Sequence, residues 1–379
     1  MRVVHIISGL RNGGAEAILF RLVTNDPENQ HTVVSMMNEG YYGARLRDCN
    51  VDLVTLQMPP GKLTAKGLFQ LWRALRRLRP QVVQTWMYHA DLAGGIVARL
   101  AGNNAVVWGL HHTTLDVQRT PRAIRLLARA CAFASRFVPS RIISCSDEGV
   151  VVHRRLGYSS EKLVTVNNGY DVNEFSPSLE ARERTRSNLA VTKDTVLLGM
   201  VGRWHEQKDH ENLLLALQLL KTATDKSWHC IMVGPGVDEK NDVLLSSRKN
   251  KYLTDHVRFL GPTDDVPALM NALDIHVLSS AFGEAFPNVI AEAMACGTPC
   301  ITTDVGDAAL MVGTMGWSVP PSDPDALQAA LTTAIDAMTD TTSWNSLQVE
   351  AVARVTSHFA LPGMVAAYSR VWNEAIRQA

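Results

Sequence analysis

The chain has 379 residues, of which 46% are hydrophobic and 20% charged, a balance typical of globular proteins with enough apolar residues for two cores. No run of about 18 apolar residues occurs, so no membrane-spanning helix is expected. The six cysteines form no Cys-x-x-Cys pair, which argues against a disulfide framework or a zinc site and favours a reducing cytoplasm. The opening MRVVHIISGL is interrupted by Arg11 and Asn12 and indicates a buried strand rather than a secretion signal.

The net charge of zero hides an asymmetry between the two halves of the chain. Residues 1–176 contain 21 lysines and arginines against 13 aspartates and glutamates, whereas residues 177–379 contain 16 against 24. A basic first half and an acidic second half suggest two domains with different partners. A chance imbalance is the alternative.

Apolar or β-branched runs alternate with helical patterns along the first half of the chain. The predicted strands cover 2–7, 32–36, 51–56, 81–86, 105–110 and 141–145. The predicted helices cover about 14–24, 66–78, 88–101 and 121–137. Several strands are apolar throughout rather than alternating, which is typical of a parallel sheet covered on both faces.

The second half repeats this rhythm, which indicates an α/β fold built twice. Its predicted strands cover 195–201, 228–233, 256–260, 274–278 and 299–303, and its predicted helices cover about 208–222, 265–272, 286–296 and 324–338. The stretch 167–180, rich in Asn, Gly, Ser and Pro, separates the halves as a linker. We therefore predict two domains, 1–175 and 176–360, and a last helix over 361–379 that packs back onto the first domain.

Ligands of open parallel sheets bind beyond the carboxyl ends of the strands, so the residues after each strand are the candidates for a site. The first strand is followed by SGLRNGGAEA, in which Gly13 and Gly14 precede a helix whose free N–H groups could face an anion. The spacing does not match GxGxxG, so a dinucleotide fingerprint is not found. The turn is either a phosphate or acceptor loop or a purely structural turn. His111 follows the strand 105–110 and could hydrogen-bond a substrate hydroxyl, or belong to a merely polar loop.

Two cations follow the strand 195–201 in the segment GRWHEQK. Arg203 and Lys208 flank a tight connection into a helix, where positive charge is unfavourable for the helix dipole. An anion would offset them, and a diphosphate fits because arginine offers a bidentate fork and lysine a point charge. Two solvated loop residues are the alternative.

Two acids mark the segment GEAFPNVIAEAMACGTPC at 283–300. Glu284 lies before a helix whose first turn we expect over 286–289, with Pro287 suited to that turn because its missing N–H costs nothing there. Glu292 lies further along the apolar helix, where a carboxylate could accept two hydroxyls, as on a ribose. The alternative is an exposed Glu292 and a capping Glu284.

These motifs together resemble the retaining family-4 glycosyltransferases of the GT-B fold. The resemblance rests on Glu284-x7-Glu292 with its AMACGTP continuation, the GRWHEQK and NNGYDVNEF segments, the GGAE turn and GPG at 234–236. It covers nearly the whole chain. It implies two Rossmann-like domains with parallel sheets that face each other across a cleft, the first holding the acceptor and the second the nucleotide-sugar donor.

The resemblance also implies functions for single residues. Arg203 and Lys208 would neutralise the donor diphosphate, Glu292 would bind the ribose, and Glu284 would contact the transferred sugar. Further donor contacts would come from the Gly13-Gly14 turn, from Leu260 and Gly261 beside the base, and from the backbone N–H groups of Phe286, Asn288 and Val289. His111, or His112 next to it, would be the histidine of the catalytic pocket. The family usually has glycine after the lysine, whereas this chain has Asp209.

The implied reaction transfers a hexose-type sugar, with UDP as the default nucleotide, to a glycan or lipid-linked acceptor in cell-surface polysaccharide synthesis. Its anomeric configuration would be retained. Negative charge grows on the departing diphosphate, and Arg203, Lys208 and helix N-termini would stabilise it, so we expect no cofactor and no divalent metal. The one Asp-x-Asp, Asp323-Pro324-Asp325, is interpreted as a helix cap.

A second basic feature is the segment 119–137, with arginines at 119, 122, 125, 129 and 136 opposite the apolar Ile124, Leu127, Ala128 and Cys131. Such an amphipathic helix could lie on an anionic inner face of the plasma membrane, and RALRRLRP at 73–80 could add to it. An ordinary surface helix is the alternative. Nothing in the sequence suggests a nucleic-acid partner.

Two other classes of protein stay open at this point. A sugar-nucleotide 2-epimerase of GT-B architecture would consume the donor without an acceptor. A non-catalytic sugar-nucleotide binding module would show no turnover, although the set Glu284, Glu292, Arg203 and Lys208 argues against it. A nicotinamide dehydrogenase is disfavoured by the missing GxGxxG.

Overall fold

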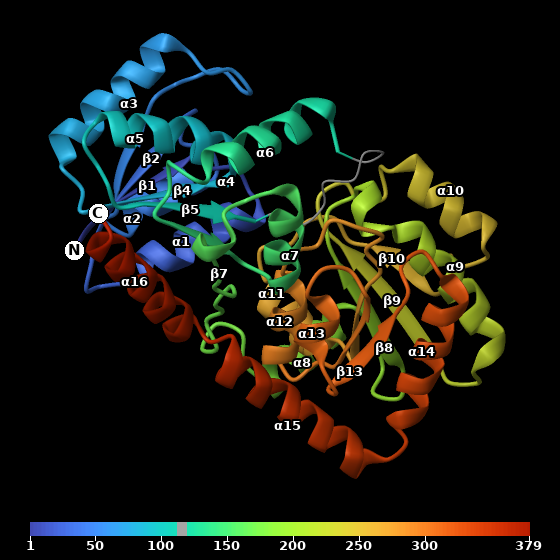
Figure 1. Ribbon diagram of the computed structural model, residues 1–379. Coiled ribbons are helices and arrows are strands. Elements are labelled where there is room, and N and C mark those ends of the chain that lie inside the picture. Colours follow the sequence, from blue (N-terminus) through green and yellow to red (C-terminus); the bar gives the residue numbers. More distant parts are fainter. Residues whose placement is uncertain (112–119) are drawn as a thin grey trace. The chain divides into compact units, whose positions relative to one another are not determined.

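The computed structural model describes residues 1–111 and 120–379, and the chain divides into two compact units (Figure 1). The first unit contains Met1–Gly169 and Leu361–Ala379, and the second contains Tyr170–Ala360. The border lies a few residues before the predicted 175. The reason is that the backbone N–H of Tyr170 already donates to Phe359, which belongs to the second unit.

The first unit is built on a seven-stranded parallel sheet with the order β3-β2-β1-β4-β5-β6-β7. Its strands are β1 (Arg2–Ile7), β2 (Gln30–Ser35), β3 (Asp52–Thr55), β4 (Val82–Trp86), β5 (Val106–Leu110), β6 (Arg141–Ser144) and β7 (Leu163–Thr165). Strands β4 and β5 are buried at every position. This burial fits their continuous apolar sequence, because a central parallel strand is covered on both faces.

Helices cover both faces of this sheet. They are α1 (Gly14–Thr24), α2 (Tyr42–Asp48), α3 (Ala65–Leu78), α4 (Met87–His89), α5 (Gly95–Leu100), α6 (Arg122–Ala134), α7 (Asp147–Leu156) and α16 (Leu361–Arg377), with the short helix η2 (Ser160–Lys162). One core joins the sheet to α1 and α16, and a second joins it to α3, α5 and α6. No helix in the described ranges combines the length and the apolarity that crossing a bilayer requires.

The predicted helix over 88–101 is interrupted by a π-helical turn, η1 (Ala90–Gly94). Asp91 in this turn is fully buried, and its Oδ1 accepts from the Thr85 hydroxyl at 2.6 Å and from the Gly109 N–H at 3.3 Å. Burial raises the pKa of the Asp91 carboxyl well above its usual value, and this carboxyl links the ends of β4 and β5. π-turns often occur at functional sites, and this turn lies just after β4.

The second unit is built on a six-stranded parallel sheet with the order β10-β9-β8-β11-β12-β13. Its strands are β8 (Val196–Val201), β9 (Trp228–Val233), β10 (Val257–Phe259), β11 (Ile275–Leu278), β12 (Cys300–Thr303) and β13 (Gly316–Val319). Its helices are α8 (Leu179–Asn188), η3 (Glu206–Lys208), α9 (His210–Ala223), α10 (Asp242–Asn250), α11 (Val266–Ala272), α12 (Asn288–Ala295), α13 (Ala308–Val312), α14 (Pro324–Ala337) and α15 (Thr341–His358). Helices α9, α10 and α14 share one core with the sheet, while α11, α12 and α13 cover the other face (Figure 1).

The parallel α/β fold of both halves is confirmed, and Asp323 does cap α14, since its side chain accepts from the Ala326 N–H at 2.9 Å. The sequence missed several short elements, among them β7, β13, α2, α7 and α13. These elements span three to ten residues, and a run that short is weakly periodic.

Candidate functional site

The strand order of the second unit changes direction between β8 and β11. Strands β9 and β10 lie on one side of β8, and β11 to β13 lie on the other. The crevice beyond the carboxyl ends of strands at such a point is where open α/β sheets bind ligands. The loops that leave β8 and β11 carry Arg203, Lys208 and Glu284, so the topology brings these distant segments to one place.

Lys208 and Glu284 form an ion pair at this point. Nζ of Lys208 lies 2.6 Å from Oε1 of Glu284, and their side chains are only 15% and 8% exposed. The Ser280 hydroxyl donates to the same oxygen at 2.7 Å, and Nε2 of Gln207 donates at 3.4 Å. Sequence reasoning proposed Lys208 and Glu284 separately and missed Ser280 and Gln207. Their positions beside the two candidates are the only signal that could have found them.

The two loops are also joined through their backbones. The Ser279 hydroxyl lies 2.9 Å from the carbonyl oxygen of Lys208 and 3.0 Å from that of Asp209. The N–H of Ala281 donates to the carbonyl of Gln207 at 2.8 Å. These contacts fix the position of Lys208 relative to Glu284, which is the preorganisation that a charge-stabilising site requires.

Asp209 occupies the position where the resembled family usually has glycine. Its φ of 47° and ψ of 55° are left-handed, a conformation that aspartate adopts more readily than most residues with a side chain. Its Oδ1 accepts from the Asn212 N–H at 3.2 Å and caps α9, and its Oδ2 accepts from the Ser322 hydroxyl at 2.9 Å. The loop therefore keeps the glycine-like backbone and gains a helix cap.

Replacing Asp209 with alanine is expected to lower the free energy of unfolding by about 2 kcal/mol, because the cap is worth ~1 kcal/mol and a left-handed alanine costs ~1 kcal/mol more. Asp209→Gly is expected to lose only a few tenths of a kcal/mol, because glycine is tolerated in the same conformation. Urea unfolding of both variants measures the difference. Equal losses in the two would contradict this account.

Glycines close the loops after β8, β9 and β10. A Cβ on Gly234, whose φ is 148°, would lie 2.3 Å from the carbonyl oxygen of Gly202. The Gly234 N–H donates to the carbonyl of Gly261 at 2.9 Å, so Gly261 lies in the same group of loops. Arg203, between these glycines and Lys208, is exposed and forms no ion pair with any residue in the described ranges.

Helix α12 begins later than the sequence predicted. Its first residue is Asn288, and Pro287 is the capping residue with φ −70° and ψ 109°, so Phe286 lies before the helix. The Phe286 ring is buried and meets the Phe359 ring edge-on, 5.3 Å between centroids. Asn288 Oδ1 accepts from the Tyr170 hydroxyl at 2.8 Å. The first-turn N–H groups therefore come from Asn288 and Val289, not from Phe286.

Glu292 lies in the second turn of α12 and is only 8% exposed. The alternative of an exposed helix carboxylate is therefore wrong. A buried carboxylate needs hydrogen-bond donors or a positive charge. The assignment of Glu292 to the ribose of a donor stays a prediction.

Two buried histidines, His210 and His276, lie close enough to Lys208 for its positive charge to lower their pKa values. Burial, and then this charge, lowers the pKa of His210 to about 4 and that of His276 to about 3. Both imidazoles are therefore neutral at neutral pH. The two histidines therefore add no charge at neutral pH beside the Lys208–Glu284 ion pair.

In the first unit the strand order changes direction between β1 and β4. The predicted turn after β1 contains Gly13, which caps α1 in an extended conformation, and Gly14, its first residue. A Cβ on Gly13 would lie 2.5 Å from a Glu16 carboxylate oxygen, so Glu16 folds back over this turn. Burial raises the pKa of the Glu16 carboxyl.

The turn borders a largely apolar cavity of about 310 Å³. Three methionines, Met36, Met37 and Met58, line it together with the loop 59–63. Arg11, Glu16, Lys62 and His89 add polar groups to its wall. This combination suits a ligand with an apolar part and an anionic or hydroxylated part.

His111 follows β5, and its ring stacks on Trp86 with 5.1 Å between centroids and 13° between planes. The Trp86 indole donates to Nδ1 of His5 at 3.2 Å, so His5 carries its proton on Nε2 and donates to Nδ1 of His31 at 2.9 Å. His31 then donates from Nε2 to Asp26 at 3.2 Å. A directed chain of buried polar groups therefore supports the ring against which His111 packs. His112 lies outside the described residues.

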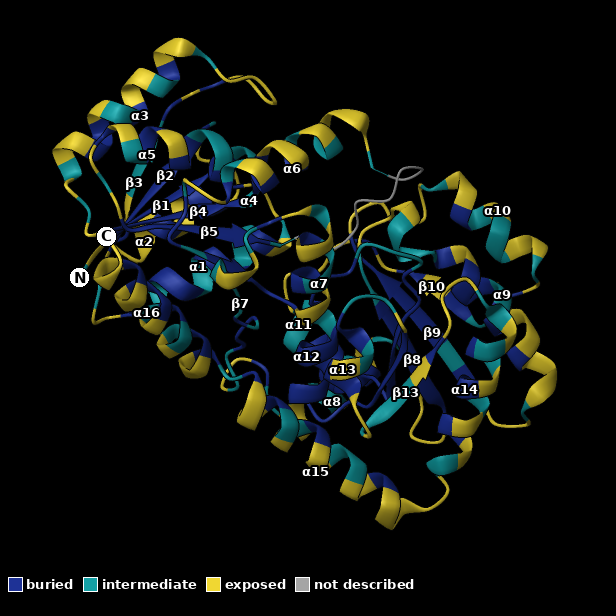
Figure 2. Cartoon of the chain, in the orientation of Figure 1, coloured by how far each residue is buried: buried dark blue, intermediate teal, exposed yellow. Residues whose placement is uncertain are grey.

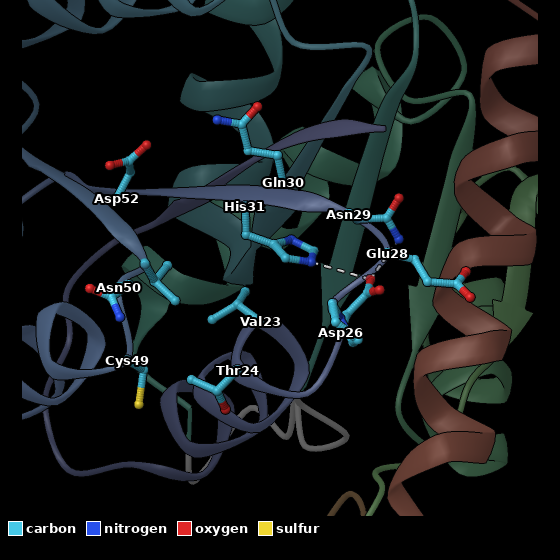
Figure 3. A pocket seen from close by; sticks show the side chains of 12 residues that line it. Val23, Thr24, Asp26, Glu28, Asn29, Gln30, His31, Cys49, Asn50 and Asp52 are labelled. Atoms are coloured by element: carbon cyan, nitrogen blue, oxygen red, sulfur yellow. Dashed lines mark hydrogen bonds and ion pairs between the residues drawn. The ribbon is translucent and has the colours of Figure 1, made fainter.

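Figure 3 shows a second cavity of the first unit, about 560 Å³, which contains the His31–Asp26 pair. Its residues lie at or just before the first residues of β2 and β3 and at or just after the last residues of α1 and α2, so it lies at the amino edge of the sheet. Within residues 1–111 and 120–379, no group of three or more His, Cys, Asp or Glu side chains is placed to hold a metal ion. The cavity is at the wrong edge for the predicted site, and the candidate residues do not line it.

Comparison with known proteins agrees with this architecture. Residues 4–174 match the family model described as Glycosyltransferase Family 4, and residues 195–337 match the model described as Glycosyl transferases group 1. The fold and the two matches define a glycosyltransferase of the GT-B class. Its first unit carries the family-4 match and its second unit the group-1 match, so the chain is a glycosyltransferase that combines both.

The similarity to relatives and to solved structures extends over most of the chain. The putative glycosyltransferase EpsF of Bacillus subtilis is 26% identical over 317 residues, 80% of this chain and 79% of the relative. The UDP-Gal:alpha-D-GlcNAc-diphosphoundecaprenol alpha-1,3-galactosyltransferase of Escherichia coli is 24% identical over 72% of this chain and 70% of the relative. The crystal structure of Anabaena HepE in complex with UDP superposes with a TM-score of 0.86 at 21% identity, covering 98% of this chain and 100% of that one.

Proposed function

We propose that this glycosyltransferase moves a hexose-type sugar from UDP to a glycan or lipid-linked acceptor, with retention of configuration and without a divalent metal. The observation that carries the proposal is the Lys208–Glu284 pair, 2.6 Å apart at the switch point of the second sheet. UDP is supported by the E. coli relative, whose name specifies UDP-Gal, and by the HepE structure, which contains UDP.

In the proposed reaction the bond between the sugar C1 and the diphosphate oxygen breaks, and its electron pair leaves with the diphosphate. The acceptor oxygen bonds to C1, and its proton passes to the departing diphosphate or to water. When the donor binds, Lys208 leaves Glu284 and pairs with the diphosphate, and Arg203 contributes a second positive charge to it. The N–H groups of Asn288 and Val289 also face the negative charge of the diphosphate. Glu284, released from Lys208, positions the transferred sugar. These fixed positive groups are the reason that we expect no metal requirement.

The acceptor would bind to the first unit. His111 and the Gly13-Gly14 turn lie at the carboxyl edge of that sheet, and the methionine-lined cavity lies beside the turn. An apolar wall with Arg11 and His89 suits an acceptor that joins an apolar chain to a diphosphate and a sugar. The E. coli relative is named for an acceptor of this kind, and for an alpha linkage. An α-linked donor would give that product by retention.

The proposal is tested by incubating the purified protein with a panel of UDP-sugars and polyprenyl-diphosphate sugars after treatment with a chelator. We expect transfer to the acceptor, an α-linked product, and full activity without added metal. Loss of activity that only metal restores would refute metal independence. Donor consumption without any acceptor would favour the 2-epimerase, and binding without turnover would favour a binding module.

The assignment of Glu292 to the ribose makes a separate prediction. Glu292→Gln keeps the shape but loses the charge, and a hydrogen bond to a charged group is worth about 1.5–3 kcal/mol, so the donor KM is expected to rise roughly 10–100-fold at little cost in kcat. With the wild type, a donor that contains 2′-deoxyribose should show a similar rise in KM relative to the ribose donor. With the variant, the two donors should differ little in KM. The exposed Glu183→Gln is the matched control. If the wild type and Glu292→Gln discriminated equally between the ribose and 2′-deoxyribose donors, the assignment of Glu292 to the ribose would be wrong.

A further inference from the structure

Exposed aromatic and aliphatic side chains gather on the outer side of three helices of the first unit. The fractional exposure is 66% for Phe133, 67% for Phe137 and 73% for Leu100. Three more apolar side chains of these helices are exposed, namely Phe69, Ile96 and Leu126. Among the residues that the structure describes, all the exposed phenylalanines lie here, and a group of exposed apolar side chains on a surface often marks an interaction site.

The three helices form one continuous surface. The Trp72 indole of α3 donates to the carbonyl oxygen of Leu100, at the end of α5, at 3.4 Å. The Arg99 guanidinium of α5 donates to the carbonyl of Val138, just after α6, at 2.7 Å. Figure 2 shows α3 and α6 with mostly exposed residues on their outer sides. We call this area the α3–α5–α6 surface.

Cations alternate with the apolar side chains on this surface. On α6 the exposed stripe runs Arg122, Leu126, Arg129 and Phe133 and continues to Phe137, at spacings of three to four residues. On α3, Phe69 stacks on Trp72 with 5.8 Å between centroids, and the Arg76 guanidinium lies 6.0 Å from the Trp72 ring. The three helices, and the segment 120–141, contain no aspartate or glutamate at all.

The sequence proposed a different membrane-facing side for this helix. The apolar residues that it named, Ala128 and Cys131, are buried in the core, and Ile124 and Leu127 pack against that core. That face is therefore an ordinary helix face of a globular unit. The apolar residues that remain available are Leu126 and Phe133 on the opposite side, among the arginines.

We propose that the α3–α5–α6 surface docks the protein on an anionic lipid bilayer. The arginines of this surface form no ion pair within residues 1–111 and 120–379 and would attract anionic headgroups, while exposed phenylalanine and leucine side chains can enter the boundary between headgroups and acyl chains. Arginine alone would suit a nucleic acid equally well. Rings and aliphatic chains between the arginines favour lipid, because a duplex backbone presents no apolar layer.

The surface is next to the methionine-lined cavity in the first unit. The loop 59–63 that lines this cavity leads directly into α3, and a Cβ on Gly67 of α3 would contact the Met58 side chain. If the acceptor is lipid-linked, which rests on the proposed function, it could pass from the bilayer to the cavity along α3. The docking itself does not depend on that step.

Vesicle co-sedimentation of the full chain tests the proposal. We expect binding to phosphatidylcholine vesicles that contain about one third phosphatidylglycerol, and little binding to phosphatidylcholine alone. Arg129→Gln with Arg136→Gln should weaken binding about 30-fold, because each cation near the surface contributes ~1 kcal/mol. Phe133→Ser with Phe137→Ser should weaken it at least about tenfold.

Matched controls lie outside the surface. Arg154→Gln with Arg155→Gln removes the same charge from exposed positions on α7, and Tyr252→Ser removes a 77% exposed ring from the second unit. Both should bind vesicles like the wild type. Equal binding to neutral and anionic vesicles would overturn the proposal, as would tighter binding to a DNA duplex than to anionic vesicles. Vesicle binding by a protein that transfers no sugar would leave the docking intact and refute the proposed function alone.

Discussion

Replacing Lys208 with methionine is expected to lower kcat by about 10²–10³, because removing one preorganised donor from a developing negative charge costs about 2.7–4 kcal/mol of barrier. Methionine matches the lysine side chain as far as Cε and lacks only the ammonium group. This part of the side chain lies along Gly202, where an added Cβ would meet Lys208 carbons at 3.4 Å. The loss should appear in kcat and in kcat/KM together, because the interaction strengthens as the diphosphate leaves. Steady-state kinetics with the preferred UDP-sugar measure both.

The same change is expected to destabilise the second unit. Breaking a buried ion pair leaves one charge uncompensated and typically costs about 3–5 kcal/mol, and Glu284 would lose its cation while Ser280 and Gln207 remain as donors. Lys208→Met with Glu284→Gln removes both charges and should recover most of the stability. Activity should stay low, because the cation is still missing.

Lys226→Met is the control for this experiment, because Lys226 is an exposed lysine of the same unit. It should leave both kcat and the free energy of unfolding unchanged. The double variant Lys208→Met with Glu284→Gln separates the effect of Lys208 on kcat from its effect on the free energy of unfolding. If it regained activity together with stability, Lys208 would be a structural partner of Glu284 and the charge-stabilising function would be wrong.

Much of the candidate site in the second unit could be predicted, because its residues lie directly after strands. The runs 195–201 and 274–278 are apolar enough to identify as strands, and the loops that leave neighbouring parallel strands lie at one edge of the sheet. The contact between Lys208 and Glu284 could not be predicted, because it joins residues 76 positions apart and depends on the order of strands in the sheet. Ser280 and Gln207 were missed for the same reason.

Local backbone geometry explains other differences. Phe286 was expected in the first turn of α12, but Pro287 adopts the extended conformation of a cap and the helix begins after it. The resembled family usually has glycine at the position of Asp209, and Asp209 adopts the left-handed conformation itself. On α6 the arginine spacing was visible in the sequence, whereas the side on which Phe133 and Leu126 emerge depends on which face the core covers.

Acid is expected to destabilise the second unit well above the pH at which its carboxylates titrate. The pKa of His276 is lowered to about 3 and that of His210 to about 4 in the folded unit, whereas an unfolded histidine has a pKa near 6.5. Between these values the unfolded chain binds protons that the folded unit does not, so the free energy of unfolding falls as the pH falls. Each histidine contributes about 1.4 kcal/mol per pH unit, and together they should remove about 3–4 kcal/mol between pH 7 and pH 5.

His276→Leu should remove about half of this loss. The imidazole is fully buried on β11, and neither ring nitrogen has a hydrogen-bond partner among the described residues, so leucine sacrifices no hydrogen bond. Hydrogen exchange of β8 and β11 amides at pH 7 and pH 5 reads the stability of this unit separately from the other. His358→Leu replaces an exposed histidine on α15, and its free energy of unfolding should fall between pH 7 and pH 5 by as much as in the wild type. An unchanged pH dependence in His276→Leu would show that this imidazole is protonated in the folded unit, and Lys208 would then have a charged neighbour rather than a neutral one.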